Sequence, residues 1–149
     1  MTRVRTGALL AVEVPAPGIR VVRVAGDLDD AAALRIKALA KVLLDRVLQE
    51  APRAGEAHLV MDLACVRWFG DTVGPAALLA LRDDAASCGV GVHLTGLSGR
   101  QLLLPGCVAD LLSGVSTYPT VEVALRELTG PPREVDRGMR TLSGGSHPR

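Results

Sequence analysis

The chain has 149 residues, a formal net charge of +1 and 48% hydrophobic residues. These values suit one compact domain with a substantial core, and the near-zero charge argues against a nucleic-acid groove or a polybasic membrane face. Only 2% of the residues are aromatic, so the usual stacking platforms for single-stranded nucleic acid are missing. No apolar run reaches the roughly 18–20 residues that a membrane-spanning helix needs, and no signal-peptide core follows the basic N-terminus.

The first half of the chain predicts a hairpin and then a long helix. Residues 8–14 and 19–24 have the apolar or alternating patterns of strands, and the prolines and glycine of residues 15–18 predict a turn between them. Gly26 ends the second predicted strand. Asp29 or Asp30 is then a suitable N-cap for a helix over residues 31–50. The buried stripe of this helix is predicted to contain Ile36, Leu39, Ala40, Leu43 and Val47.

The second half alternates strands with helices. A strand covered on both faces is predicted over residues 58–63, and a turn follows it. The remaining predictions are helices over residues 75–87 and 119–128, strands over 92–96 and 115–118, a short helix over 101–104 and a helical turn over 108–112. The order β-β-α-β-α-β-α-β-α predicts an α/β fold with a mixed, mostly parallel sheet flanked by helices.

Both ends of the chain differ in character from the centre. Residues 1–7 are predicted to be a flexible N-terminus. Residues 130–149 contain few apolar side chains and are predicted to be a disordered tail, because such a segment cannot offset the entropy cost of ordering. One domain is therefore expected over residues 8–129.

Residues 71–74, Asp-Thr-Val-Gly, place a hydroxyl beside a carboxylate at the start of a predicted helix. The free N–H groups of a helix N-terminus carry partial positive charge, so a phosphate or a partner protein can be received there. The simpler interpretation is that Asp71 and Thr72 cap the helix, a role worth about 1 kcal/mol. The residues themselves leave both interpretations open.

Several other side chains have a structural and a functional interpretation. Trp68 and Phe69 either anchor a partner or pack in the core. His93 lies in an apolar strand and is interpreted as a satisfied or half-exposed strand histidine rather than a catalytic base. A metal site could in principle combine loop and strand carboxylates, but solvated carboxylates and caps are commoner, and no metal is expected. The candidate carboxylates are Asp27, Asp29, Asp30, Asp62 and Asp71.

Cysteine and nucleophile patterns also point away from catalysis. Cys65, Cys88 and Cys107 are widely spaced and form neither a metal-binding pair nor a disulfide framework, which is typical of a reducing cytosol. No Ser, Cys or Thr has a recognisable base near it in a motif. We therefore expect a cytoplasmic protein that is not an enzyme and uses no cofactor.

Four segments, in their order and spacing, resemble the STAS family, the domain of bacterial anti-sigma-factor antagonists. Residues 26–29, Gly-Asp-Leu-Asp, are similar to the family's Gly-x-Leu-Asp after a strand, and residues 71–74 match its Asp-Ser/Thr-x-Gly turn. The other two segments are residues 59–66, which resemble the central strand and its following turn, and residues 91–96 with 118–125, which resemble the closing strand and last helix.

The resemblance implies a regulatory function. In the antagonist branch, the hydroxyl after that Asp is phosphorylated by a partner kinase that is also the anti-sigma factor, and the unphosphorylated form binds this kinase and frees the sigma factor. Thr72 becomes the candidate phosphorylation site. The expected partner is then an anti-sigma serine/threonine kinase. Neither nucleic-acid binding nor direct membrane insertion is expected, and the protein could also form a homo-oligomer. The candidate partner-binding residues are Gly26, Asp27, Leu28, Asp29, Asp71, Thr72, Val73 and Gly74.

Two alternatives accompany this interpretation. The first keeps the STAS fold without the phosphorylation, as a scaffold subunit or a member of a lipid-transport complex. The second is a receiver-type phosphoacceptor domain, with Asp62 as the acceptor and Asp29 and Asp30 holding Mg²⁺. The second is disfavoured by the order of elements, because a receiver needs a further strand where this chain predicts only a helix.

Overall fold

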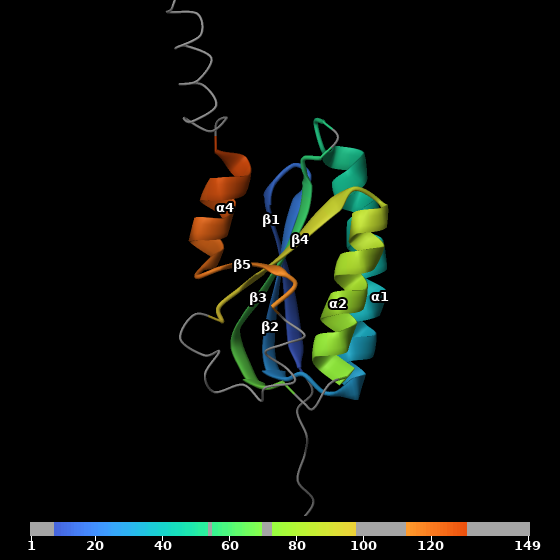
Figure 1. Cartoon of the computed structure of the whole chain (residues 1–149), viewed down its shortest axis with the longest axis vertical. Coiled ribbons are helices and arrows are strands. Elements are labelled where there is room, and N and C mark those ends of the chain that lie inside the picture. Colours follow the sequence, from blue (N-terminus) through green and yellow to red (C-terminus); the bar gives the residue numbers. More distant parts are fainter. Residues whose placement is uncertain (1–7, 54, 70–72, 98–112, 131–149) are drawn as a thin grey trace, which may run out of the picture.

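The computed structural model describes residues 8–53, 55–69, 73–97 and 113–130, which form one sheet with helices on both faces (Figure 1). This arrangement confirms the predicted α/β class with its mixed, mostly parallel sheet. The elements are β1 (Leu9–Ala16), β2 (Ile19–Asp27), α1 (Asp30–Glu50), β3 (Ala57–Trp68), α2 (Val73–Ser87), β4 (Val90–Thr95), β5 (Ser116–Tyr118) and α4 (Val121–Thr129).

The strands lie in the sheet in their chain order, β1-β2-β3-β4-β5. β1 and β2 form the predicted antiparallel hairpin, and Gly18 in its turn has a φ of 83°, a conformation that favours glycine. The other neighbouring strands are parallel. Parallel neighbours need a crossover connection, which α1 supplies between β2 and β3 and α2 supplies between β3 and β4.

The helices divide between the two faces of the sheet. α1 and α2 lie side by side on one face and α4 covers part of the other (Figure 1). The predicted stripe of α1 is confirmed, since Ile36, Ala40, Leu43 and Val47 are buried and Leu39 is partly buried against the core. The smaller cluster under α4 consists of Val21, Val60, Val121 and Ala124. β3 is thus covered on both faces, as predicted.

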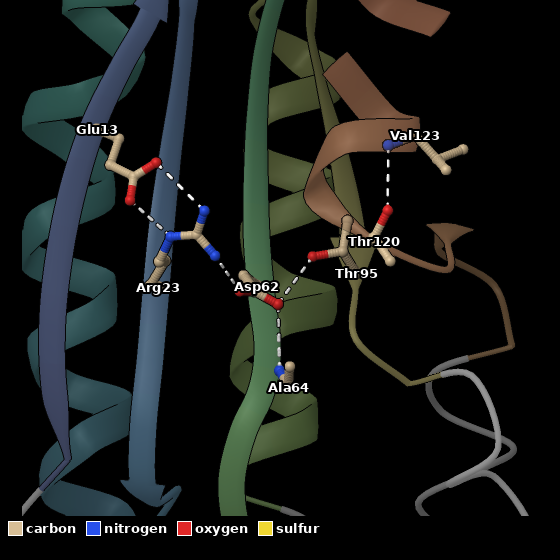
Figure 2. Close-up of polar contacts among 7 residues, drawn as sticks. All are labelled: Glu13, Arg23, Asp62, Ala64, Thr95, Thr120 and Val123. Carbon is tan, nitrogen blue, oxygen red and sulfur yellow. Dashed lines mark hydrogen bonds and ion pairs between the residues drawn. The ribbon is translucent and has the colours of Figure 1, made fainter. Parts of the chain in front are cut away.

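Helix N-caps explain where α1 and α4 begin. Asp29, one of the two predicted candidates, caps α1 by accepting a hydrogen bond at 2.9 Å from the backbone N–H of Ala32. Thr120 caps α4 in the same way, accepting at 3.2 Å from the backbone N–H of Val123 (Figure 2). Each cap satisfies one of the backbone donors that a helix start leaves without an intrahelical partner.

Some predicted boundaries were wrong. The predicted ends of the second strand near Gly26 and of the third at Leu63 are both too early, because β2 and β3 continue together to the register pair Asp27 and Trp68. Strand pairing overrides the break that Gly26 signals in isolation. α2 and β4 each begin two residues before their predicted starts, at Val73 and Val90.

Other predictions fall outside the described residues. These are the short helix over residues 101–104, the turn over 108–112, the flexible N-terminus of residues 1–7 and, apart from Gly130, the disordered tail. No helix in the described part of the chain combines the length and the apolar character needed to cross a bilayer.

Candidate functional site

The segment of residues 26–29 lies at the carboxyl end of β2 and is fastened to the end of β3. The backbone N–H of Leu28 donates a hydrogen bond of 2.7 Å to the carbonyl oxygen of Trp68. Gly26 has a φ of 99°, which a residue with a Cβ adopts only at a cost in strain. Since β2 and β3 are parallel, the helices that follow them begin at the same edge of the sheet. The candidate site is this edge.

Three side chains of this segment have different surroundings. The Leu28 side chain is fully buried, so it positions the segment rather than offering a contact surface. Asp29 is occupied in capping α1. Asp27 is partly exposed and forms a 3.7 Å ion pair with Arg67, a surface contact that contributes little to stability.

Trp68 is the last residue of β3 and Phe69 follows it, and the two side chains have different surroundings. The Trp68 side chain is 47% exposed, whereas Phe69 is 5% exposed and belongs to the core under α1 and α2. Phe69 therefore packs in the core, whereas partner anchoring stays a prediction for Trp68. Trp68 leaves a large aromatic surface in solvent beside the segment of residues 26–29.

The predicted partner-binding residues are only partly described. Gly26, Asp27, Leu28 and Asp29 are brought together with the end of β3, as set out above. Val73 and Gly74 are the first two residues of α2. Asp71 and Thr72, the residues that directly precede α2 in the chain, lie outside the described residues.

A chain of polar contacts crosses four strands on the face of the sheet that α4 partly covers (Figure 2). The Arg23 guanidinium donates from Nε to Glu13 at 2.6 Å and from Nη1 to Asp62 Oδ2 at 2.6 Å. Thr95 Oγ1 and the backbone N–H of Ala64 both donate to Asp62 Oδ1, at 3.0 and 3.2 Å. Hydrogen bonding to Glu13, together with the charges of Glu13 and Asp62, raises the pKa of Arg23.

This contact chain was missed by the sequence analysis. The alternation of Arg23 with Val22 and Val24 placed the arginine on one face, but its partner Asp62 lies 39 residues away and can be found only from the strand register. Asp62 itself was considered as a metal ligand or a phosphoacceptor. Instead it lies inside β3, where its side chain is only 11% exposed. Among the residues that the structure describes, no three His, Cys, Asp or Glu side chains group closely enough to hold a metal ion.

Two histidines contact each other on the same face of the sheet. His58 Nδ1 lies 3.1 Å from His93 Nε2, and His93 Nδ1 lies 3.1 Å from Ser116 Oγ. Gly91 makes room for them, because an added Cβ would lie 2.9 Å from His58 Nδ1. Burial, with a smaller effect from His58, lowers the pKa of His93 to about 4, and burial also lowers the pKa of His58. Both rings are therefore neutral at neutral pH, and His93 has the satisfied environment expected of it.

No protein-family model and no curated protein sequence matches this chain. Solved structures do match. The anti-sigma factor antagonist SpoIIAA in its unphosphorylated form aligns with a TM-score of 0.61 at 17% identity, covering 83% of this chain and 100% of that one. An anti-sigma factor antagonist from Mycobacterium paratuberculosis aligns with a TM-score of 0.56 at 25% identity, covering 83% and 95%.

The phosphorylated form of SpoIIAA from Bacillus aligns with a TM-score of 0.54 at 16% identity, covering 80% of this chain and 99% of that one. The chain therefore has the STAS fold of the anti-sigma factor antagonists, which confirms the fold that the sequence resemblance implied.

Proposed function

We propose that this protein is a non-catalytic antagonist of an anti-sigma factor, and that phosphorylation of Thr72 controls its binding to an anti-sigma serine/threonine kinase. One observation carries the proposal. The Asp-Thr pair directly precedes α2, which begins at the same edge of the sheet as the segment of residues 26–29 and the exposed Trp68. The shared fold supports it, and SpoIIAA is known in both phosphorylated and unphosphorylated forms.

The proposed control is electrostatic. A threonine hydroxyl is neutral, whereas its phosphate adds about 1.5–2 negative charges at neutral pH. The N-terminus of α2 favours that charge by roughly 0.3–1 kcal/mol, while Asp71 repels it. Burying the charge in a contact without cationic partners costs several kcal/mol, and about 1.4 kcal/mol already lowers affinity tenfold. Phosphorylation can therefore stop binding without a large change in shape.

The proposed partner surface contains one acidic and one aromatic side chain, those of Asp27 and Trp68. Asp27 provides a partly exposed carboxylate and Trp68 an exposed ring, the residue type most enriched among binding hot spots. The segment is held in place by the buried Leu28 side chain and by the hydrogen bond that Asp29 accepts from the start of α1. A partner that fits this edge would offer a pocket for the Trp68 ring and a cation near Asp27.

The test combines phosphosite mapping with binding of the candidate kinase by calorimetry. We expect the kinase to place a single phosphate on Thr72, and Thr72→Glu to bind at least about a hundredfold more weakly than Thr72→Ala, a difference of about 2.7 kcal/mol. Thr117→Glu is the matched control, because Thr117 is an exposed threonine on the edge strand β5, two strands away from β3 in the sheet. Equal binding of Thr72→Glu and Thr72→Ala would overturn the proposal.

Two phosphorylation assays separate the proposal from its alternatives, a STAS scaffold without phosphorylation and a receiver domain. A STAS scaffold without regulation would bind its partner but accept no phosphate. A receiver domain would need Asp62 as its acceptor, yet Arg23, Thr95 and the Ala64 backbone already engage both Asp62 oxygens. Label from acetyl phosphate should therefore not enter Asp62.

A further inference from the structure

We propose that β1 is a homodimer interface, at which two copies of the chain pair their β1 strands antiparallel and join their sheets into one. The proposal concerns the outer edge of the sheet and does not depend on Thr72 or on the proposed partner. It therefore goes beyond the proposed function, and each can fail without the other.

The first observation is that β1 has a free and apolar edge. Within the described part of the chain β1 pairs only with β2, so its outer backbone groups have no strand beside them. Three of its large apolar side chains are exposed, Leu9 by 70%, Val12 by 42% and Val14 by 61%. A free strand edge with apolar side chains is a template for pairing with another chain, and β-strand addition is a common form of recognition.

The second observation is that the usual protection of an edge strand is weak here. Natural edge strands are short or carry charged side chains, prolines or β-bulges that discourage pairing. β1 has eight residues, and its only charged side chain is Glu13, which Arg23 already binds. Pro15 and the irregular register with β2 both lie after Glu13, so the stretch from Leu9 to Glu13 is regular and able to pair.

The opposite edge of the sheet provides a contrast within the same molecule. β5 has only three residues, Ser116–Tyr118, and two of them are exposed polar side chains. Such a short polar strand discourages pairing. Among the described residues, one edge of the sheet is therefore protected and the other is open, which points to β1 as the edge that is used.

The third observation identifies the occupant as a second copy. With a twofold axis at Val12, the antiparallel pairs are Val12 with Val12, Leu10 with Val14, and Ala11 with Glu13. Apolar side chains face apolar side chains along one row, and no two like charges stand opposite each other. Each Glu13 keeps its own Arg23. This self-complementarity is what an isologous twofold interface requires, and an unrelated peptide has no reason to share it.

The experiment is sedimentation equilibrium of the full chain over a wide concentration range. We expect a reversible monomer–dimer equilibrium. Val12→Lys brings two ammonium groups together at the axis and should weaken the dimer at least about tenfold. The control is Leu34→Lys, which introduces the same charge at a residue of α1 that is 69% exposed and lines the groove between α1 and α2, and which should leave the equilibrium unchanged.

Circular dichroism checks that Val12→Lys is folded, and Val14→Lys replaces it as the test variant if it is not. Hydrogen exchange provides a second readout, since β1 amides should become more protected as the protein concentration rises. The proposal is overturned if the chain stays monomeric, if Val12→Lys and Leu34→Lys behave alike, or if β1 amides are protected only when a different protein is added.

Discussion

Neighbouring residues of β3 face two different environments. Leu59 and Met61 belong to the large apolar cluster under α1 and α2, whereas Val60 belongs to the small cluster under α4, and Asp62 shares its face with Arg23 and Thr95. The face covered by α1 and α2 is held mainly by burial of Val, Leu, Ile and Ala side chains. The opposite face combines a small apolar patch with polar contacts and a histidine pair.

This contrast teaches where each kind of perturbation should act. Loss of volume should be most damaging on the α1–α2 face, because a close-packed apolar core relaxes only partly around a cavity. Loss of a hydrogen-bond partner or a change in pH should act on the α4 face. The predictions below test this division in order of expected effect.

The largest effect is expected for Leu59→Ala, which removes a side chain that is 1% exposed in the main cluster. We expect the free energy of unfolding to fall by about 2–5 kcal/mol, measured by urea denaturation. Leu34→Ala is the control, because Leu34 on α1 is 69% exposed and its truncation should cost less than about 0.5 kcal/mol. Similar losses from both substitutions would contradict the assignment of the core to this face.

An intermediate effect is expected for Asp62→Ala. The substitution removes the acceptor of the fully buried Thr95 hydroxyl and one hydrogen bond of the Ala64 N–H, so we expect the free energy of unfolding to fall by about 2–3 kcal/mol in the same denaturation assay. Asp62→Asn keeps an acceptor of the same shape and should cost less.

Glu13→Ala tests the other end of the same contact chain. Glu13 and Arg23 are about half exposed, and such surface pairs contribute about 0–1 kcal/mol. If Glu13→Ala destabilised the protein as much as Asp62→Ala, the buried part of the contact chain would not be its stabilising part.

The smallest effect is expected from pH. The pKa of His93 is lowered from its ordinary value of 6.5 to about 4 in the folded state. As the pH falls from 6.5 toward 4, His93 therefore binds a proton in the unfolded chain more readily than in the folded one. Stability should therefore be complete above about pH 6.5 and decrease as the pH falls toward 4, by on the order of 1 kcal/mol after allowance for solvent screening. His58 acts in the same direction.

His93→Gln checks this assignment. The variant lacks the titrating ring but keeps a polar side chain near His58 and Ser116. Its melting temperature should change less between pH 6.5 and 5 than that of the unmodified chain. A pH profile that is identical in the two proteins would show that His93 is not responsible. The interval stays above pH 4.5, the ordinary pKa of Glu50. The hydrogen bond from Arg20 lowers the pKa of Glu50 in the folded state, so at lower pH the stability that this bond contributes would also decrease and add a second effect.

The sequence by itself determined the features that depend on neighbouring residues in the chain. The 3.6-residue period located α1 and its buried stripe, Asp29 was one of two suitable caps, and the Pro-Gly turn predicted the hairpin. The four segments shared with the STAS family predicted the fold that the solved structures confirm. The role of Thr72 stays a prediction, because that residue lies outside the described part of the chain.

Only the tertiary structure decided the features that depend on distant partners. β2 and β3 continue past their predicted ends because each pairs with the other, and a local break signal carries no information about that pairing. Asp62 meets Arg23 and Thr95 across 39 and 33 residues of chain, so the contact exists only once the strand register is set. Trp68 and Phe69 are adjacent aromatic residues in the sequence but differ in burial. Phe69 packs in the core cluster under α1 and α2, whereas Trp68 is exposed.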